Sequence, residues 1–144
     1  MPALPRVQTV MLPILNAYPA IANRVPAVKC GTWIPEIDYR DFPLIHLRRI
    51  GGSRNRNHPT KLGLSVVEMT AFGAVSLPDT ENLYEDALEA LYDAVERQVV
   101  VPDVGHLSSI KETMGATQFG SPFQDSWRVQ GLIQLGVRPP RPTS

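Results

Sequence analysis

The side chains of this 144-residue sequence that could support catalysis are three histidines, one cysteine and a row of acids. His46, His58 and His106 lie far apart in the chain, and none has a metal-ligand spacing such as HExxH. Cys30 has no neighbour that would activate it as a nucleophile, so a small core residue is the expected role. No phosphate-binding glycine loop and no GxSxG motif is present. The sequence therefore predicts no catalytic centre, no metal site and no cofactor.

The acidic row recurs at the spacing of one helix face and consists of Glu85, Glu89, Asp93 and Glu96. Paired carboxylates can act as a general acid and a general base. The simpler interpretation is the solvated face of an amphipathic helix. On this interpretation the row is available for contact with another protein.

Positive charge is concentrated between residues 48 and 61, in Arg48, Arg49, Arg54, Arg56, His58 and Lys61. The chain carries 14 basic and 14 acidic residues, and the zero net charge argues against a general nucleic-acid coat. The basic stretch is nevertheless locally strong in potential. It could contact phosphates or an acidic neighbour, or it could be a solvated loop.

The last seven residues read Arg-Pro-Pro-Arg-Pro-Thr-Ser and include Arg138 and Arg141. Such a run resembles a polyproline ligand for an aromatic groove. The favoured interpretation is an extended C-terminal arm with no fold of its own. We include both arginines among the candidate interaction residues.

Hydrophobic spacing predicts the elements that would position these side chains. Helices are expected at residues 6–17 and 77–98, the second with Asp79 as its N-cap. Strands are expected at residues 28–34, 44–50, 64–72, 110–119 and 127–137. The basic loop at 51–61 would join the second strand to the third, and residues 99–107 would be a linker.

The resulting order, α-β-β-β-α-β-β, is that of an α+β domain. We expect a mostly antiparallel sheet of about five strands with two helices packed on one face, formed by residues 1–137, and an extended tail at 138–144. A single cysteine allows no intrachain disulfide and fits a reduced, cytoplasmic setting. No apolar run approaches the ~20 residues of a membrane helix, and no signal peptide is expected.

Four stretches resemble a known family. They are Pro-Arg-Val-Gln-Thr from residue 5, the segment 31–52 with Gly-Thr-Trp-Ile-Pro-Glu-Ile-Asp-Tyr-Arg-Asp-Phe-Pro and Arg-Arg-Ile-Gly-Gly, Val-Glu-Met-Thr-Ala from residue 67, and Leu-Tyr-Glu-Asp-Ala-Leu-Glu-Ala-Leu-Tyr-Asp-Ala-Val from residue 83. Together they resemble the tail terminator proteins of long-tailed siphophages that infect mycobacteria and related actinobacteria. The resemblance covers about the first two-thirds of the chain.

This resemblance implies a structural protein of the virion, not an enzyme. Such proteins form a six-subunit ring that caps the head-proximal end of the tail tube, ends its polymerisation and presents a face to the connector or stopper proteins of the head. Genomic DNA passes through the ring without specific binding. Assembly takes place in the host cytoplasm, and no membrane is involved. In such a ring, the acidic row and the basic stretch are candidates for complementary subunit surfaces.

Two other interpretations remain open. A head–tail connector or stopper has the same size range and the same partners. A small nucleic-acid-binding module could use the basic stretch, although this stretch lacks the interleaved aromatic residues that stack on bases.

Overall fold

Strands form where apolar and β-branched residues alternate, and helices form where apolar residues recur every three or four positions. The computed structural model describes residues 4–25, 29–30, 43–120 and 126–140. Its elements are α1 (Val7–Ala17), α2 (Pro19–Ala22), β1 (Lys29–Cys30), β2 (Leu44–Arg54), β3 (Gly63–Gly73), α3 (Leu77–Glu96), β4 (Val100–Val101), β5 (Gly105–Phe119) and β6 (Trp127–Arg138).

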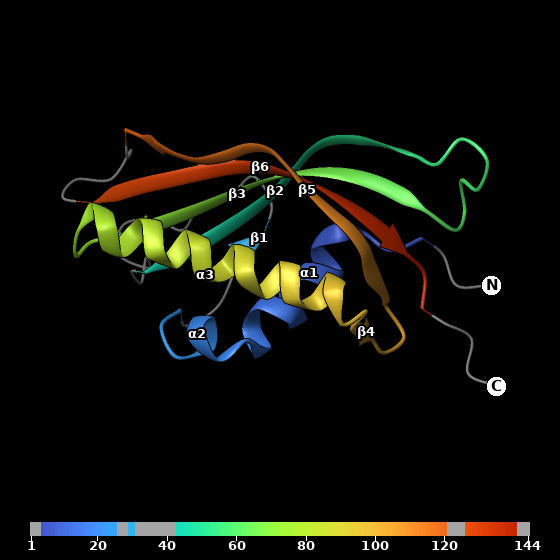
Figure 1. Cartoon of the computed structure of the whole chain (residues 1–144), viewed down its shortest axis with the longest axis horizontal. Coiled ribbons are helices and arrows are strands. Elements are labelled where there is room, and N and C mark those ends of the chain that lie inside the picture. Colours follow the sequence, from blue (N-terminus) through green and yellow to red (C-terminus); the bar gives the residue numbers. More distant parts are fainter. Residues whose placement is uncertain (1–3, 26–28, 31–42, 121–125, 141–144) are drawn as a thin grey trace.

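The strands form one sheet in the order β1-β2-β3-β6-β5-β4. The four long strands are antiparallel to one another in the order β2, β3, β6 and β5, whereas the described residues of β1 run parallel to β2. The sheet is strongly twisted, and the helices lie on one side of it (Figure 1). The α+β class, the mostly antiparallel sheet and the order of the main elements are confirmed, with α2 and β4 as additional short elements.

The core lies between the sheet and the two long helices. Val67, Ile133 and Leu135 of the central strands are fully buried, because alternate side chains of a strand point to the same face. Leu83 and Leu91 of α3 cover them, and α1 adds its own apolar side to the same core. Pro13 lies inside α1 without ending it. The alternate apolar residues of β3 and β6 therefore face this core.

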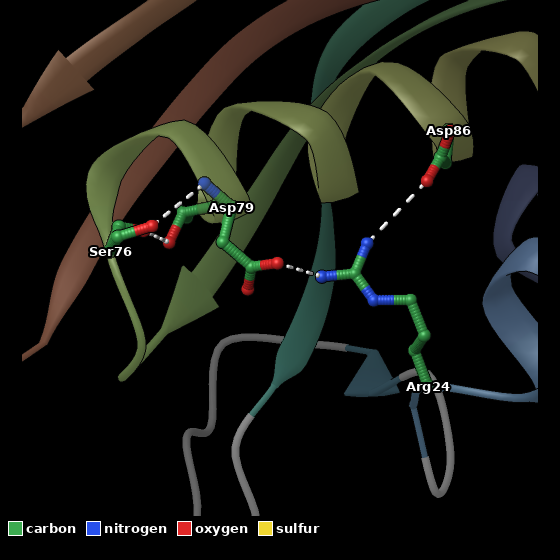
Figure 2. Close-up of polar contacts among 5 residues, drawn as sticks. Arg24, Ser76, Asp79 and Asp86 are labelled. Atoms are coloured by element: carbon green, nitrogen blue, oxygen red, sulfur yellow. Dashed lines mark hydrogen bonds and ion pairs between the residues drawn. The ribbon is translucent and has the colours of Figure 1, made fainter.

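The first turn of α3 is fixed by a cap and by Arg24, which lies just after α2 (Figure 2). Ser76 is the N-cap, and its hydroxyl accepts a hydrogen bond from the backbone N–H of Asp79 at 3.1 Å. Arg24 reaches across to the carboxylates of Asp79 at 2.9 Å and Asp86 at 3.5 Å. The expectation that Asp79 is the cap was wrong, because the helix begins at Leu77 with Pro78 in its first turn, a favoured position for proline.

The hairpin of β2 and β3 is longer than predicted. The expected loop at 51–61 is strand as far as Arg54, and the connection covers only residues 55–62. A bulge between Arg49 and Gly51 shifts the register, and Gly52 adopts φ +114°, so the strand continues through two glycines. This change moves Arg54 from the loop to the end of β2.

The second hairpin also begins earlier than predicted. The expected linker at 99–107 contains β4 and the start of β5, separated by a turn in which Asp103 adopts φ +64°. Arg138 is the last residue of β6 and not the first residue of a tail. The expected strand at 28–34 is described only at Lys29–Cys30, and Arg141 and the expected turn at 121–125 lie outside the described residues.

Candidate functional site

The residues considered for catalysis do not lie together in one site among the described residues. His46 lies on β2 and His106 at the start of β5, both buried, whereas His58 is exposed in the connection between β2 and β3. Across the part of the chain that the structure describes, no three His, Cys, Asp or Glu side chains gather as metal ligands would. The backbone of Cys30 belongs to β1, and its side chain lies outside the described residues.

A cavity of about 370 Å³ lies between the junction of α1 and α2, the end of α3 and β4. Its wall is mostly apolar and includes Ile14, Tyr18 and Pro102. The charged residues of the wall, Asp93 and Arg97, bind each other at 2.7 Å. This cavity therefore presents no charged group free to act on a substrate.

The acidic row divides into two parts in the structure. Asp93 is held by Arg97 through two hydrogen bonds, at 3.0 and 2.7 Å. Glu85 and Glu89, nearer the start of α3, are exposed and share their surroundings with Glu112 of β5. The hydroxyl of Tyr92 donates a hydrogen bond to Glu112 at 2.9 Å and ties the helix to this strand. Glu96 is exposed beyond both groups.

Like charges in this acidic group affect ionisation. The pKa of Glu85 is raised, first by partial burial and then by the carboxylates of Glu112, Glu89 and Glu81. The pKa of Tyr92 is also raised, chiefly because its proton is held by Glu112. Among the described residues, the groups that shift the pKa of Glu85 all raise it, so none of them favours its charged form.

We expect Glu85→Gln to raise the melting temperature near neutral pH. A carboxylate whose pKa is higher in the folded chain than in the unfolded chain destabilises the fold when ionised, and the penalty disappears below the ordinary value of 4.5. Thermal unfolding at neutral and acidic pH measures this. The gain should vanish in acid, and Glu96→Gln, outside the group, should change the melting temperature less. A gain that persists in acid would contradict this explanation.

The basic stretch also divides. Arg48 and Arg49 are consecutive on β2 and point to opposite faces of the sheet. Arg48 binds Glu68 of β3 at 3.4 Å, whereas Arg49 donates only to the carbonyl oxygen of Gly51 at 3.3 Å. The two arginines therefore differ in their contacts, because among the described residues Arg48 has a carboxylate partner and Arg49 does not.

Arg54, Arg56 and Lys61 mark the tip of the hairpin, which we define as residues 54–62. Its turn is ordered by Asn55, whose side-chain oxygen accepts hydrogen bonds from the backbone N–H groups of Asn57 and His58, both at 2.9 Å. Arg54 donates to the carbonyl oxygen of Pro59 at 3.3 Å. Within the described chain, the side chains of Arg56 and Lys61 make no hydrogen bond or ion pair, although the backbone N–H of Lys61 donates to the carbonyl oxygen of His58. The hairpin tip thus presents cations without acidic partners.

The sequence analysis missed Glu112 and Tyr92 as members of the acidic group. They lie 20 residues apart and meet only because α3 crosses β5. Arg138 is exposed at the end of β6, away from this group, and pairs in register with His106. None of the described helices is both long and apolar enough to cross a membrane.

Comparisons with known proteins agree with this picture of a structural domain. A family model described as "Phage tail termination protein" matches residues 3–144. The chain is 58% identical to the "Gene 22 protein" of Mycobacterium phage L5 over 143 residues, covering 99% of both chains. It is 56% identical to the "Gene 22 protein" of Mycobacterium phage D29 over 144 residues, covering both chains fully.

Among solved structures, a chain of the "Virion of native gene transfer agent (GTA) particle" has a TM-score of 0.54 at 13% identity. The alignment covers 92% of this chain and 94% of that one. This likeness supports the fold. The resemblance to mycobacteriophage tail terminators, inferred from the sequence, is confirmed by the family model and by the two phage relatives.

Proposed function

The chain belongs to the phage tail termination protein family, and from this premise we propose that it forms a ring on the head-proximal end of the tail tube. The ring stops tube polymerisation and offers its other face to the connector or stopper proteins of the head. The observation that carries the proposal is the extent of the family match, residues 3–144, which includes every described helix and strand. A head–tail connector role is less favoured, because the matched family is named for termination.

The proposed partners are other copies of this chain, with six as the expected number, the tube protein and the head proteins. Genomic DNA would pass through the hole without specific binding. These partners place the protein at the head-proximal end of the tail in the virion, after assembly in the host cytoplasm. Three features support this assembly role over an enzymatic one. The described histidines do not lie together, Asp93 and Arg97 of the cavity wall bind each other, and charged residues are exposed on the surface.

The hairpin tip is the proposed contact with the tube or with an adjoining ring component. It lies at the end of the sheet where β5 begins and β6 ends, because Arg54, Gly63, Val137 and Leu107 share one row of the sheet. Figure 1 shows it projecting from that end. A DNA channel must let its cargo slide, and cations that bind phosphate tightly would oppose this. We therefore favour a protein contact for Arg56 and Lys61 over a position lining the hole.

Electron microscopy of polymerising tube protein with and without this chain tests the function. Density at one end only, with shorter or more uniform tubes, is expected. Tubes of unchanged length with both ends bare would overturn the terminator role, and binding to the head connector would be measured next.

We expect the charge-reversed pair Arg54→Glu and Arg56→Glu to abolish attachment of the ring to tubes while leaving the fold intact, because both side chains are exposed. Counting capped tube ends measures the effect. The matched control, Arg54→Lys with Arg56→Lys, keeps the charge and should cap tubes normally. Normal capping by the glutamate variant, followed by poor DNA delivery from assembled particles, would instead place the hairpin tip at the DNA channel.

A further inference from the structure

The cavity between the α1–α2 junction, the end of α3 and β4 has a mostly apolar wall that includes several prolines. Pro13, Pro19 and Pro102 line it, and all three are exposed, so the cavity opens to solvent. Tyr18 adds an aromatic residue to the same wall. The volume of about 370 Å³ lies near the lower end of the range of about 300–1,000 Å³ for binding clefts. This size and this wall suit a short extended segment.

Two polar groups of the wall can still form hydrogen bonds. Arg97 binds Asp93 through Nε and Nη2, and both hydrogen bonds end on Oδ2 of the carboxylate. Among the described residues, Oδ1 of Asp93 accepts no hydrogen bond and the hydroxyl of Tyr18 makes none. The side chain of Asp93 is 39% exposed. Because a carboxylate has two oxygens that each accept more than one hydrogen bond, Asp93 can accept from a second arginine.

The sequence contains a segment with matching chemistry, the C-terminal arm, which the end of β6 limits to residues 139–144. Pro139 and Pro140 are half-buried, so the arm lies against the protein where it leaves the sheet. These two residues and Pro142 lack a backbone N–H, so such a segment can lie on an apolar wall with few unsatisfied donors. Proline-rich segments dock in aromatic-lined grooves in this way, and Arg141 adds a cation.

The arm leaves the sheet level with the strand that lines the cavity. Arg138 pairs with His106, and His106 pairs with Val100 of β4, so two strand spacings, about 10 Å in all, separate the end of β6 from β4. β4 and β6 both run antiparallel to β5, so Val101 and Pro102 follow Val100 in the direction that the arm takes. Figure 1 shows β4 and the end of β6 at the same end of the sheet. Since the arm spans about 19 Å as a polyproline helix, it is long enough to reach the cavity of its own subunit.

We propose that this cavity is a binding site for a proline-rich segment and that its occupant is the C-terminal arm of the same subunit. The prolines of the arm lie against Tyr18 and Pro102, and Arg141 donates to Oδ1 of Asp93. The arm thereby covers the apolar wall that α1, α2, α3 and β4 share. The inference does not depend on the proposed ring or on its partners.

A photoreactive side chain in the cavity wall identifies the occupant. p-Benzoylphenylalanine replaces Ala17, an exposed residue of the wall, in the full chain, and mass spectrometry locates the cross-links formed on irradiation. A mixture of isotope-labelled and unlabelled chains separates links within one chain from links between copies. We expect links to residues 139–144 within one chain. The same group at Val75, which is 77% exposed just before α3, should form none with the arm.

Cleavage by a proline-specific endopeptidase measures how often the arm is released. Arg141→Glu places like charges together and should speed cleavage after Pro142 on the order of threefold or more, because cleavage follows the released fraction. Arg141→Lys keeps the charge and is the matched control, with cleavage near the wild-type rate. Each rate is divided by that of the matching synthetic peptide of residues 138–144, which removes any preference of the protease for the new side chain. Circular dichroism confirms the fold of each variant.

Two results would overturn the proposal. Cross-links to the arm of another copy, or to no residue of 139–144, would show that the arm of the same subunit is not the occupant. Equal normalised cleavage of Arg141→Glu and Arg141→Lys would show that Arg141 does not bind at Asp93 and would rule out the arm as placed here. Neither measurement involves tube capping, so both results leave the proposed terminator function untouched.

Discussion

Gly131→Ala is expected to lower the free energy of unfolding by about 3 kcal/mol, as overpacking of a close-packed core does. A Cβ at this position in β6 would run into the hydroxyl of Tyr84, and it would also lie 2.8 Å from Tyr84 Cζ and 2.8 Å from the carbonyl oxygen of Met114. Tyr84 is fully buried in α3 and has no room to move away. Urea or guanidinium denaturation measures the change.

Two further variants identify the tyrosine as the cause. Gly115→Ala changes another strand glycine whose Cβ would meet only Glu112 Oε1, at 4.0 Å, so its effect should be small. Tyr84→Phe removes a buried hydroxyl that has no hydrogen-bond partner in the described structure, and such a group costs about 1–3 kcal/mol. This variant should be as stable as the wild type or more stable.

The double variant Gly131→Ala with Tyr84→Phe should regain part of the loss. Recovery stays incomplete because the Met114 carbonyl and the ring carbon remain close. If Gly131→Ala unfolds at the wild-type denaturant concentration, helix α3 does not pack on β6 as described.

The same glycine shows where sequence reasoning succeeds and where it stops. Within the strand expected at 127–137, a period of two predicts that Gly131 shares a face with Val129 and Ile133, and both of these are buried. That the glycine accommodates a tyrosine hydroxyl from α3 is a contact across 47 positions. No local pattern in either segment encodes this pairing.

The charged candidate surfaces could likewise be predicted only in part from the sequence. The acidic row and the basic stretch could be found from spacing alone, since both are visible as charge patterns. The ion pair of Asp93 with Arg97 and the ion pair of Arg48 with Glu68 could not be predicted in this way, because each depends on a neighbour in the next turn or in another strand. Glu112 was predicted to lie in a strand, but its hydrogen bond with Tyr92 follows only from the way α3 crosses β5.

The limits of the basic loop were predicted wrongly for a related reason. Two consecutive glycines usually mark the end of a strand. Here Gly52 uses its freedom at φ +114° to continue the strand past a bulge, and Ser65 of β3 lies opposite it. A bulged strand and a turn can have the same local composition. Only the pairing with β3 shows that this segment is a strand.

Gly52→Ala is accordingly expected to disrupt the outer half of this hairpin, with a cost of about 3 kcal/mol to the ordered state. A Cβ here would collide with the carbonyl oxygen of Leu64 and lie 2.7 Å from Ser65 Cα, and φ +114° is unfavourable for alanine in any case. Both of these atoms belong to the backbone, which cannot move aside as the end of a flexible side chain can. Hydrogen exchange should therefore become faster in residues 50–66, while β6 keeps its protection.

Gly51→Ala provides the matched control, because a Cβ at Gly51 meets nothing within 4 Å and its φ is not in the positive range that strains alanine. The two variants add the same methyl group to adjacent residues of one strand. If the proposed contact of the hairpin tip is correct, Gly52→Ala should also cap fewer tubes, since Arg54 and Arg56 lose their fixed positions, and Gly51→Ala should cap them normally. Equal exchange in the two variants would mean that β2 does not continue through Gly52. Faster exchange without loss of capping would show that the tip is not the tube contact.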